Sequence, residues 1–297
     1  MKLKQKLAIG YVRAHLHILT LVSPRQAAKK AFSLFCTPRR KSGKKLPSLF
    51  DKGEKLSFRL DDHPVRGHRW LPHQRSTRTN FCPPDNTPPA CSEKVLIAHG
   101  FESSSRNFEQ YVNACLKKGY EVLAFDAPAH GRSGGRQITL PLYVDMIRTI
   151  HDRYGPIHSF MGHSLGGMAL SLFLESIPHD GTTRLVLISP PVEMVSAVDR
   201  LFQMLELDAE VRTSFDEYAY HHSGRPFSWF SLRRALHGIK ADVLWLHDED
   251  DDITPLEDML PVKKDGHPNI RWVTTKGLGH RKIYRDGDVL RQVVAFL

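Results

Sequence analysis

Apolar positions along the chain recur at two spacings, one typical of strands and the other typical of helices. Short apolar runs predict strands at residues 95–98, 121–125, 157–161, 184–188, 242–246 and 270–274. Three- and four-residue spacing predicts helices at residues 106–118, 141–154 and 165–175, near Leu256, and at 289–297. Because strands that alternate with helices form a mostly parallel sheet wrapped by helices, the pattern predicts an α/β fold. Such a fold binds ligands outside the carboxyl ends of its strands.

Two regions depart from this alternation. Residues 55–60 and 65–71 predict short strands ahead of the α/β pattern, and a proline-rich turn follows at 80–90. Residues 191–238 carry helical patterns rich in aromatic side chains. These aromatic side chains fit either the core of extra helices or a helical lid insertion over a binding site. If they form a lid, their aromatic character favours a substrate with an apolar acyl group.

An N-terminal helical arm, defined as residues 1–50, precedes a main domain at residues 51–297. Residues 2–22 predict an amphipathic helix whose apolar stripe comprises Leu3, Leu7, Tyr11, Ala14, Ile18 and Leu21. A second short helix is predicted at 24–35, and a basic linker at 37–45. Arg13, His15 and His17 argue against a signal peptide, and no apolar run reaches the roughly 18–20 residues that span a bilayer.

Positive charge is concentrated in this arm. The net charge is +10, but residues 1–50 hold twelve Lys or Arg and no Asp or Glu, which leaves 30 basic and 32 acidic residues elsewhere. A nearly neutral main domain argues against nucleic acid as a partner. The arm either contacts an anionic membrane surface peripherally or packs on the main domain, and packing is the simpler expectation.

The composition indicates a reduced, cytoplasmic protein without a metal. Hydrophobic residues make up 41% and charged residues 25%, as in ordinary globular chains. The cysteines Cys36, Cys82, Cys91 and Cys115 form no C-x-x-C pair, although Cys82 and Cys91 flank one loop and could be bridged. The histidines show no metal-ligand spacing, so no metal site is expected.

Gly162-His163-Ser164-Leu165-Gly166 is the main candidate for chemistry. A serine on a sharp strand-to-helix turn needs glycine two residues before and after it, because a Cβ there would collide with the neighbouring strand or helix. The turn would expose the hydroxyl of Ser164 to a substrate. The alternative is a helix-capping serine with glycines beside it by chance.

A nucleophilic serine needs a base, and the base needs an acid that orients it. With the chain order serine, acid, histidine, only His267 and His280 follow the acidic run 248–252. His267 precedes the strand at 270–274 and lies at the wrong edge of the sheet, whereas His280 follows it. We therefore expect His280 as the base and one carboxylate of 248–252 as the acid.

Four separated motifs resemble those of the α/β-hydrolase superfamily over roughly residue 56 to the C-terminus. They are His99-Gly100-Phe101, the loop 126–133, the serine turn 162–166 and the acidic loop 247–255. The first two are most similar to monoacylglycerol lipase-like and serine aminopeptidase-like members. The resemblance implies Asp251 as the acid, an oxyanion hole made by the backbone N–H groups of Phe101 and Leu165, and no cofactor.

The chain departs from the family pattern at two positions of the acidic loop. Asp248 replaces a usual glycine, and aspartate tolerates a left-handed backbone better than most residues. Thr254 replaces a usual valine, which we expect to be a mild change. His99, His130 and His163 are interpreted as structural, and Asp126 as a residue that ties its loop together.

These features predict a serine hydrolase that cleaves small carboxylic esters with an apolar acyl group through an acyl-enzyme. Thioesterase, amidase, peptidase and acyltransferase activities fit the same residues. A non-catalytic binding protein on the same fold is the alternative of a different class. A membrane-docked lipase delivered by its arm is a further possibility.

Overall fold

The computed structural model describes residues 3–39, 45–72 and 93–297. The turn predicted at 80–90, with Cys82 and Cys91, lies outside these residues. Cys36 and Cys115 are buried free thiols. Across the described part of the chain, no helix has both the length and the apolar character needed to cross a membrane.

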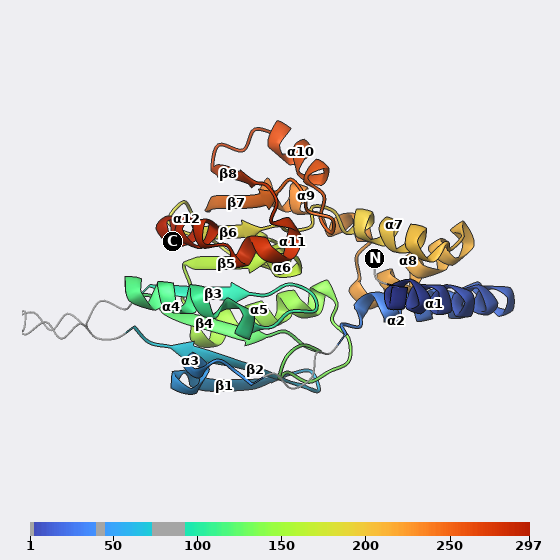
Figure 1. Ribbon diagram of the computed structural model, residues 1–297, viewed down its shortest axis with the longest axis horizontal. Coiled ribbons are helices and arrows are strands. Elements are labelled where there is room, and N and C mark those ends of the chain that lie inside the picture. Colours follow the sequence, from blue (N-terminus) through green and yellow to red (C-terminus); the bar gives the residue numbers. More distant parts are fainter. Residues whose placement is uncertain (1–2, 40–44, 73–92) are drawn as a thin grey trace, which may run out of the picture.

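A twisted eight-stranded sheet forms the centre of the molecule, with strand order β1-β2-β4-β3-β5-β6-β7-β8 (Figure 1). The β1/β2 and β2/β4 pairs are antiparallel and the other pairs are parallel, so the predicted mostly parallel sheet is confirmed. The strands are β1 Glu54–Leu60, β2 His63–Trp70, β3 Lys94–Ala98, β4 Glu121–Asp126, β5 Ser159–His163, β6 Arg184–Ile188, β7 Asp242–Asp248 and β8 Ile270–Thr275.

Helices pack on both faces of this sheet because its central strands are apolar on both sides. One face is covered by α3 Ser48–Lys52, α4 Glu109–Lys118 and α12 Gly287–Phe296. The other is covered by α5 Leu140–Tyr154, α6 Leu165–Glu175, α9 Leu232–Leu236 and α10 Leu256–Lys264. The helix predicted at 106–118 starts instead as a 3-10 turn, η1 Ser105–Phe108, because Asp126 accepts hydrogen bonds from the backbone and hydroxyl of Ser105.

Helical elements also follow β6 and precede α9, within the region predicted as an insertion. They are α7 Met194–Leu205, α8 Ala209–Ser223 and η2 Phe227–Trp229. The arm helices α1 Leu3–Val22 and α2 Pro24–Cys36 lie beside α7 and α8 at one end of the sheet (Figure 1). Phe32 of α2 and Phe215 of α8 belong to one shared apolar core, with ring centroids 5.6 Å apart.

Helix α1 packs through a different face from the one that its sequence suggested. Leu16 is fully buried, with Val12 and Leu19 packed beside it. The described members of the predicted stripe point outward instead: Leu7, Tyr11, Ala14, Ile18 and Leu21 are all exposed. The helix therefore has two apolar faces, and the predicted stripe is not the one that packs on the body.

Candidate active site

Ser164 occupies a strained turn between β5 and α6. Its φ of 53° and ψ of −128° lie outside the regions that side chains usually favour. A Cβ at Gly166 would lie 2.4 Å from the carbonyl oxygen of Ala98 at the end of β3, and one at Gly162 would lie 2.4 Å from Cα of Gly167 in α6. Both collisions predicted from the glycine spacing are confirmed, and they explain why this turn requires glycine on either side.

His280 and Asp251 converge on this serine from two other loops. His280 lies on the short helix α11 Gly279–Lys282 after β8, and Asp251 lies in the loop after β7. The Oγ of Ser164 is 3.0 Å from Nε2 of His280, and Nδ1 of His280 is 2.8 Å from Oδ2 of Asp251. Since Nδ1–H donates to the carboxylate, Nε2 is free to accept the serine proton. The geometry is that of a nucleophile, a base and an orienting acid.

Asp251 is held as a carboxylate by its neighbours. Burial alone would raise its pKa, but the hydrogen bond and charge of His280 and backbone donors hold the pKa well below its usual range. The backbone N–H groups of Ile253 and Thr254 donate to Oδ1 at 3.0 and 2.8 Å. An ionised carboxylate at this place stabilises a positive charge on the imidazole of His280.

Thr254, expected to be a mild replacement of valine, makes hydrogen bonds within the site. Its hydroxyl lies 3.0 Å from Oδ2 of Asp251 and 3.1 Å from Nδ1 of His280. Its carbonyl oxygen accepts a hydrogen bond from Nε2 of the buried His247 at 2.6 Å. The side chain that valine would provide could fill the same space, but it could not donate to Asp251.

Asp248 is placed differently from the sequence-based expectation. It is the last residue of β7, and it is absent from the residues with positive φ among those described, so no left-handed backbone explains it. Its buried carboxylate accepts hydrogen bonds from the N–H of Gly279 at 2.8 Å, the N–H of Leu278 at 3.2 Å and the hydroxyl of Thr275 at 2.7 Å. Asp248 thus anchors the loop that leads into His280. The acidic residue at a position where the family motif has glycine is the sequence feature that could have predicted this anchoring role of Asp248.

His163 supports His280 from the serine turn. Its Nε2 lies 2.9 Å from the carbonyl oxygen of His280, which can only accept, so Nε2 carries the proton. Burial, reinforced by the nearby His280, lowers the pKa of His163 to about 3. The ring is therefore neutral at physiological pH and acts as a hydrogen-bond donor that holds the backbone of α11.

The turn after β3 is fixed by buried polar contacts. Nε2 of His99 accepts a hydrogen bond from the N–H of Ala127 at 2.9 Å, and Nε2 of His130 accepts from the N–H of Glu102 at 3.2 Å. Asp126 accepts from the N–H of Arg132 at 2.8 Å in addition to Ser105. These are structural contacts of the kind expected for His99, His130 and Asp126.

This turn adjoins the serine. A Cβ at Gly100 would lie 2.9 Å from Cβ of Ser164, so the backbone of the turn passes directly beside the nucleophile candidate. Phe101, Ser164 and Leu165 line the same cavity. Leu165 begins α6, whose first N–H groups have no partner within the helix and carry the positive end of its dipole. The structure thus brings together Phe101, Ser164, Leu165, Asp251 and His280, the residues suggested by the sequence.

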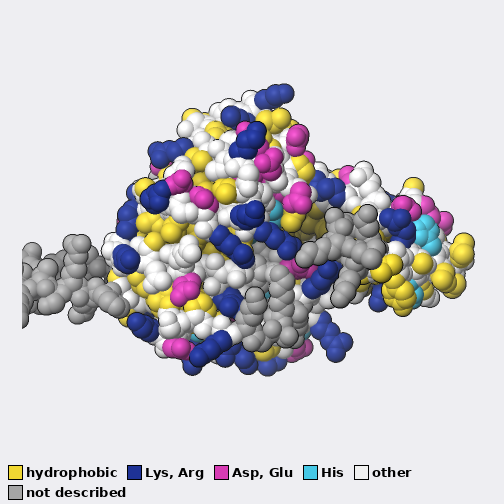
Figure 2. Space-filling model, viewed as in Figure 1, with side chains coloured by type: hydrophobic (Ala, Val, Ile, Leu, Met, Phe, Trp, Pro, Cys, Tyr) yellow, Lys and Arg dark blue, Asp and Glu magenta, His cyan; other side chains and the backbone are white. Residues whose placement is uncertain are grey.

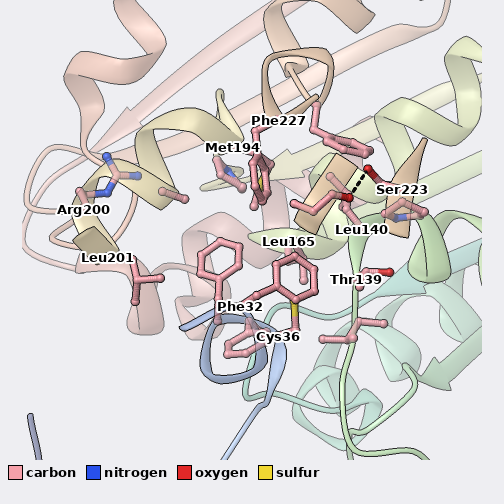
Figure 3. Close-up of a pocket in the computed structure, with 18 of the residues that line it drawn as sticks. Phe32, Cys36, Thr139, Leu140, Leu165, Met194, Arg200, Leu201, Ser223 and Phe227 are labelled. Carbon is pink, nitrogen blue, oxygen red and sulfur yellow. Dashed lines mark hydrogen bonds between the residues drawn. The ribbon is translucent and has the colours of Figure 1, made fainter. Parts of the chain in front are cut away.

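A cavity of about 410 Å³ opens beside Ser164 and runs between the arm and the inserted helices (Figure 3). Its wall is mainly apolar, with Phe32, Phe35 and Cys36 from α2 facing Met194 and Leu201 from α7. Burial raises the pKa of the Cys36 thiol to about 12, so this thiol is neutral. Helix α2 as a wall of the cavity was not foreseen, because nothing in its local pattern points to Ser164.

No group of three or more His, Cys, Asp or Glu residues suited to a metal ion occurs within residues 3–39, 45–72 and 93–297. The polar side chains around Ser164 are hydrogen-bonded to one another rather than arranged as open ligands.

A family model described as serine aminopeptidase, S33, matches residues 90–248, more than half of the chain. The chain belongs to the serine aminopeptidase S33 family. It is an α/β hydrolase, as its motifs suggested. The match includes the turn after β3 and the serine turn but ends before Asp251 and His280. The family match therefore says nothing about Asp251 and His280, and only their hydrogen bonds to each other and to Ser164 link them to the site.

Similar proteins include several hydrolases. This S33 family member is 25% identical over 213 residues to the bifunctional esterase/perhydrolase DCH of Acinetobacter calcoaceticus. The alignment covers 55% of this chain and 76% of that protein. It is 23% identical to the non-heme chloroperoxidase of Streptomyces lividans, over 68% of this chain and 91% of that protein. The Pyrococcus furiosus esterase Pf2001 matches 88% of this chain and 98% of its own with a TM-score of 0.60 at 22% identity, which shows a shared fold.

Proposed function

We propose that this protein is a serine esterase that cleaves carboxylic esters with an apolar acyl group. The observation that supports it most is the chain of two hydrogen bonds from Ser164 through His280 to Asp251, at 3.0 and 2.8 Å. The esterase activity named for the Acinetobacter calcoaceticus relative agrees with this proposal.

In the proposed mechanism, Oγ of Ser164 attacks the ester carbonyl while Nε2 of His280 takes its proton. Asp251 keeps the imidazole in the tautomer that accepts at Nε2 and stabilises the imidazolium that forms. The N–H groups of Phe101 and Leu165 bind the oxyanion, an interaction whose loss typically costs about 3–4 kcal/mol of transition-state stabilisation. The alcohol leaves with the proton of His280, and water then releases the acyl group by the reverse sequence.

The cavity favours an apolar acyl group of medium length. It is lined mainly by aliphatic and aromatic side chains and lies within the size range of small-molecule sites, roughly 300–1,000 Å³. In this proposal residues 191–238 form the lid, the arm of residues 1–50 completes the cavity through α2, and residues 51–297 form the hydrolase domain.

An ester substrate fits this cavity better than a peptide with a free amino terminus. Recognition of an ammonium group in an apolar site requires a buried carboxylate or an equivalent set of acceptors. Among the described residues that line the cavity, none is acidic, and the charged ones are Arg200 and Arg225. Activity on aminoacyl substrates is therefore expected to be low despite the name of the family.

The test is hydrolysis of p-nitrophenyl esters from acetate to palmitate, compared with aminoacyl p-nitroanilides. We expect ester turnover with an optimum at an acyl chain longer than acetate, because the cavity offers a mainly apolar volume of about 410 Å³. Ser164→Ala should lower kcat by about a thousandfold or more, because the members of a triad act as a unit.

Ser176→Ala is the matched control. Ser176 follows the opposite end of the same helix, where its hydroxyl bonds the carbonyl of Phe173. Both variants should keep the circular dichroism spectrum of the parent. Near-normal turnover by a folded Ser164→Ala protein would disprove the mechanism, and no turnover of any ester by the parent would favour a binding protein.

A further inference from the structure

The outer face of α1 carries a strip of largely exposed apolar side chains. Leu7, Tyr11, Ile18, Leu21 and Val22 have exposed fractions of 66%, 75%, 63%, 89% and 73%. Figure 2 shows apolar side chains gathered at the end of the molecule where α1 lies. We call these five residues the outer strip. So many large apolar side chains on one helix face are unusual for a surface that faces only water.

The outer strip is not a by-product of poor packing of the arm. The opposite face of α1 packs through Val12, Leu16 and Leu19 onto the shared core of α2, α7 and α8. Arg13 adds an ion pair to Glu206, which follows α7. Since α1 is held on the body by one apolar face, the second apolar face is presented outward in a fixed position.

The charge of the arm indicates what the outer strip contacts. No Asp or Glu occurs in residues 1–50. On α2, which packs beside α1, Arg25, Lys29 and Lys30 are exposed. An exposed apolar helix face on an arm with an excess of basic residues is typical of helices that lie in the surface of an anionic bilayer, with apolar side chains inserted and Lys or Arg at the headgroups.

We propose that α1 docks the protein on anionic lipid surfaces through the outer strip. Pairing of the strip with a second copy would also cover it, but it would bring two arms without acidic residues together and leave their charges uncompensated. An anionic surface covers the apolar side chains and neutralises the basic ones at the same time. This inference does not depend on the proposed esterase activity.

The experiment is sedimentation of the full-length protein with phosphatidylcholine vesicles, with and without about 30% phosphatidylserine. We expect binding to the anionic vesicles at low salt and release at high salt, because the charge attraction is screened over about 8–10 Å at physiological ionic strength. Ile18→Ser combined with Leu21→Ser should lower the partition coefficient at least tenfold. Lys29→Gln combined with Lys30→Gln should lower it about tenfold on anionic vesicles only.

Leu260→Ser is the matched control, since Leu260 is an exposed apolar residue on α10, 44% exposed and remote in sequence from the arm. The serine variants should keep the parent melting temperature, because the residues changed are exposed. The Lys29→Gln and Lys30→Gln variant should lower it only slightly, since Lys29 lies 5.7 Å from the ring centroid of Tyr218 on α8. The proposal is overturned if the parent does not sediment with anionic vesicles more than with neutral ones. It is also overturned if ultracentrifugation shows a dimer that the Ile18 and Leu21 substitutions dissociate while vesicle binding is absent.

Discussion

Asp248 and Asp251 lie in the same acidic run, yet they contact different parts of the site. Oδ2 of Asp251 lies 2.8 Å from Nδ1 of the His280 ring. Asp248 instead accepts hydrogen bonds from the backbone N–H groups of Leu278 and Gly279, the two residues before His280. Asp250 accepts a hydrogen bond from the N–H of Gly277 at 2.9 Å and Asp252 is exposed, so neither reaches the imidazole. One carboxylate orients the ring and another holds its loop.

This difference predicts unequal effects of replacing each aspartate by asparagine. Asp251→Asn should lower kcat on the best p-nitrophenyl ester by up to about ten-thousandfold, because an amide favours the wrong tautomer of His280. Asp250→Asn and Asp252→Asn should stay within about threefold of the parent, since an amide oxygen still accepts the bond to Gly277. Equal losses in the three variants would contradict the assignment of Asp251.

At the scale of elements, the arm and the inserted helices α7 and α8 share one apolar core. Ala27, Ala28 and Ala31 of α2 are fully buried in a core shared with α7 and α8. Further bonds tie the arm to the main domain: the N–H of Ile138 donates to the carbonyl of Cys36 at 2.8 Å, and Gln137 donates to the hydroxyl of Ser33 at 2.9 Å. The arm is therefore a structural part of the cavity.

Removal of residues 1–46 should consequently damage the protein. The truncation exposes buried apolar side chains such as Val198, Phe202 and Phe215, and each fully buried side chain of this size contributes about 1.5–3 kcal/mol. We expect a lower melting temperature, aggregation at concentrations where the parent is monodisperse, and a larger loss of activity on long esters than on acetate. A truncated protein with unchanged melting temperature and chain-length profile would contradict the role of α2 in the cavity.

At the scale of the whole molecule, buried histidines make stability depend on pH. His99, His163 and His247 are buried, and desolvation lowers the pKa of each below its ordinary value, to about 3 for His163. Below about pH 6.5 the unfolded chain binds protons at these residues that the folded protein does not. For His163 this contribution to stability is thus present in full above pH 6.5 and is lost as the pH falls towards about 3. For His99 and His247 stability is lost in the same direction as the pH falls below 6.5.

Urea unfolding followed between pH 7 and pH 4 should therefore show a falling free energy of unfolding. Each buried histidine contributes a slope of up to about 1.4 kcal/mol per pH unit. His163→Gln should reduce this slope, whatever its effect on the stability at pH 7, because glutamine binds no proton. A free energy of unfolding that is constant between pH 6.5 and pH 4 would contradict this account.

The sequence by itself determined the elements and the serine turn of this protein. The spacing of apolar residues indicates which side of a strand or helix is buried, and the two glycines around Ser164 indicate a turn with no room for a Cβ. Both features depend on neighbouring residues in the sequence, so they can be predicted without the tertiary structure. Elimination by strand order likewise led to His280. The resemblance to a known family supplied Asp251, which the residues alone had left open within the acidic run.

Only the tertiary structure decided which apolar face of α1 is buried, that α2 lines the cavity, and what Asp248 and Thr254 contact. Periodicity shows that a helix has an apolar face, but it does not show which of two faces finds a partner. Contacts such as that between Asp248 and the loop before His280 depend on the pairing of β7 with β8, which places the ends of two strands side by side. They join residues that are remote in sequence, so no local pattern records them.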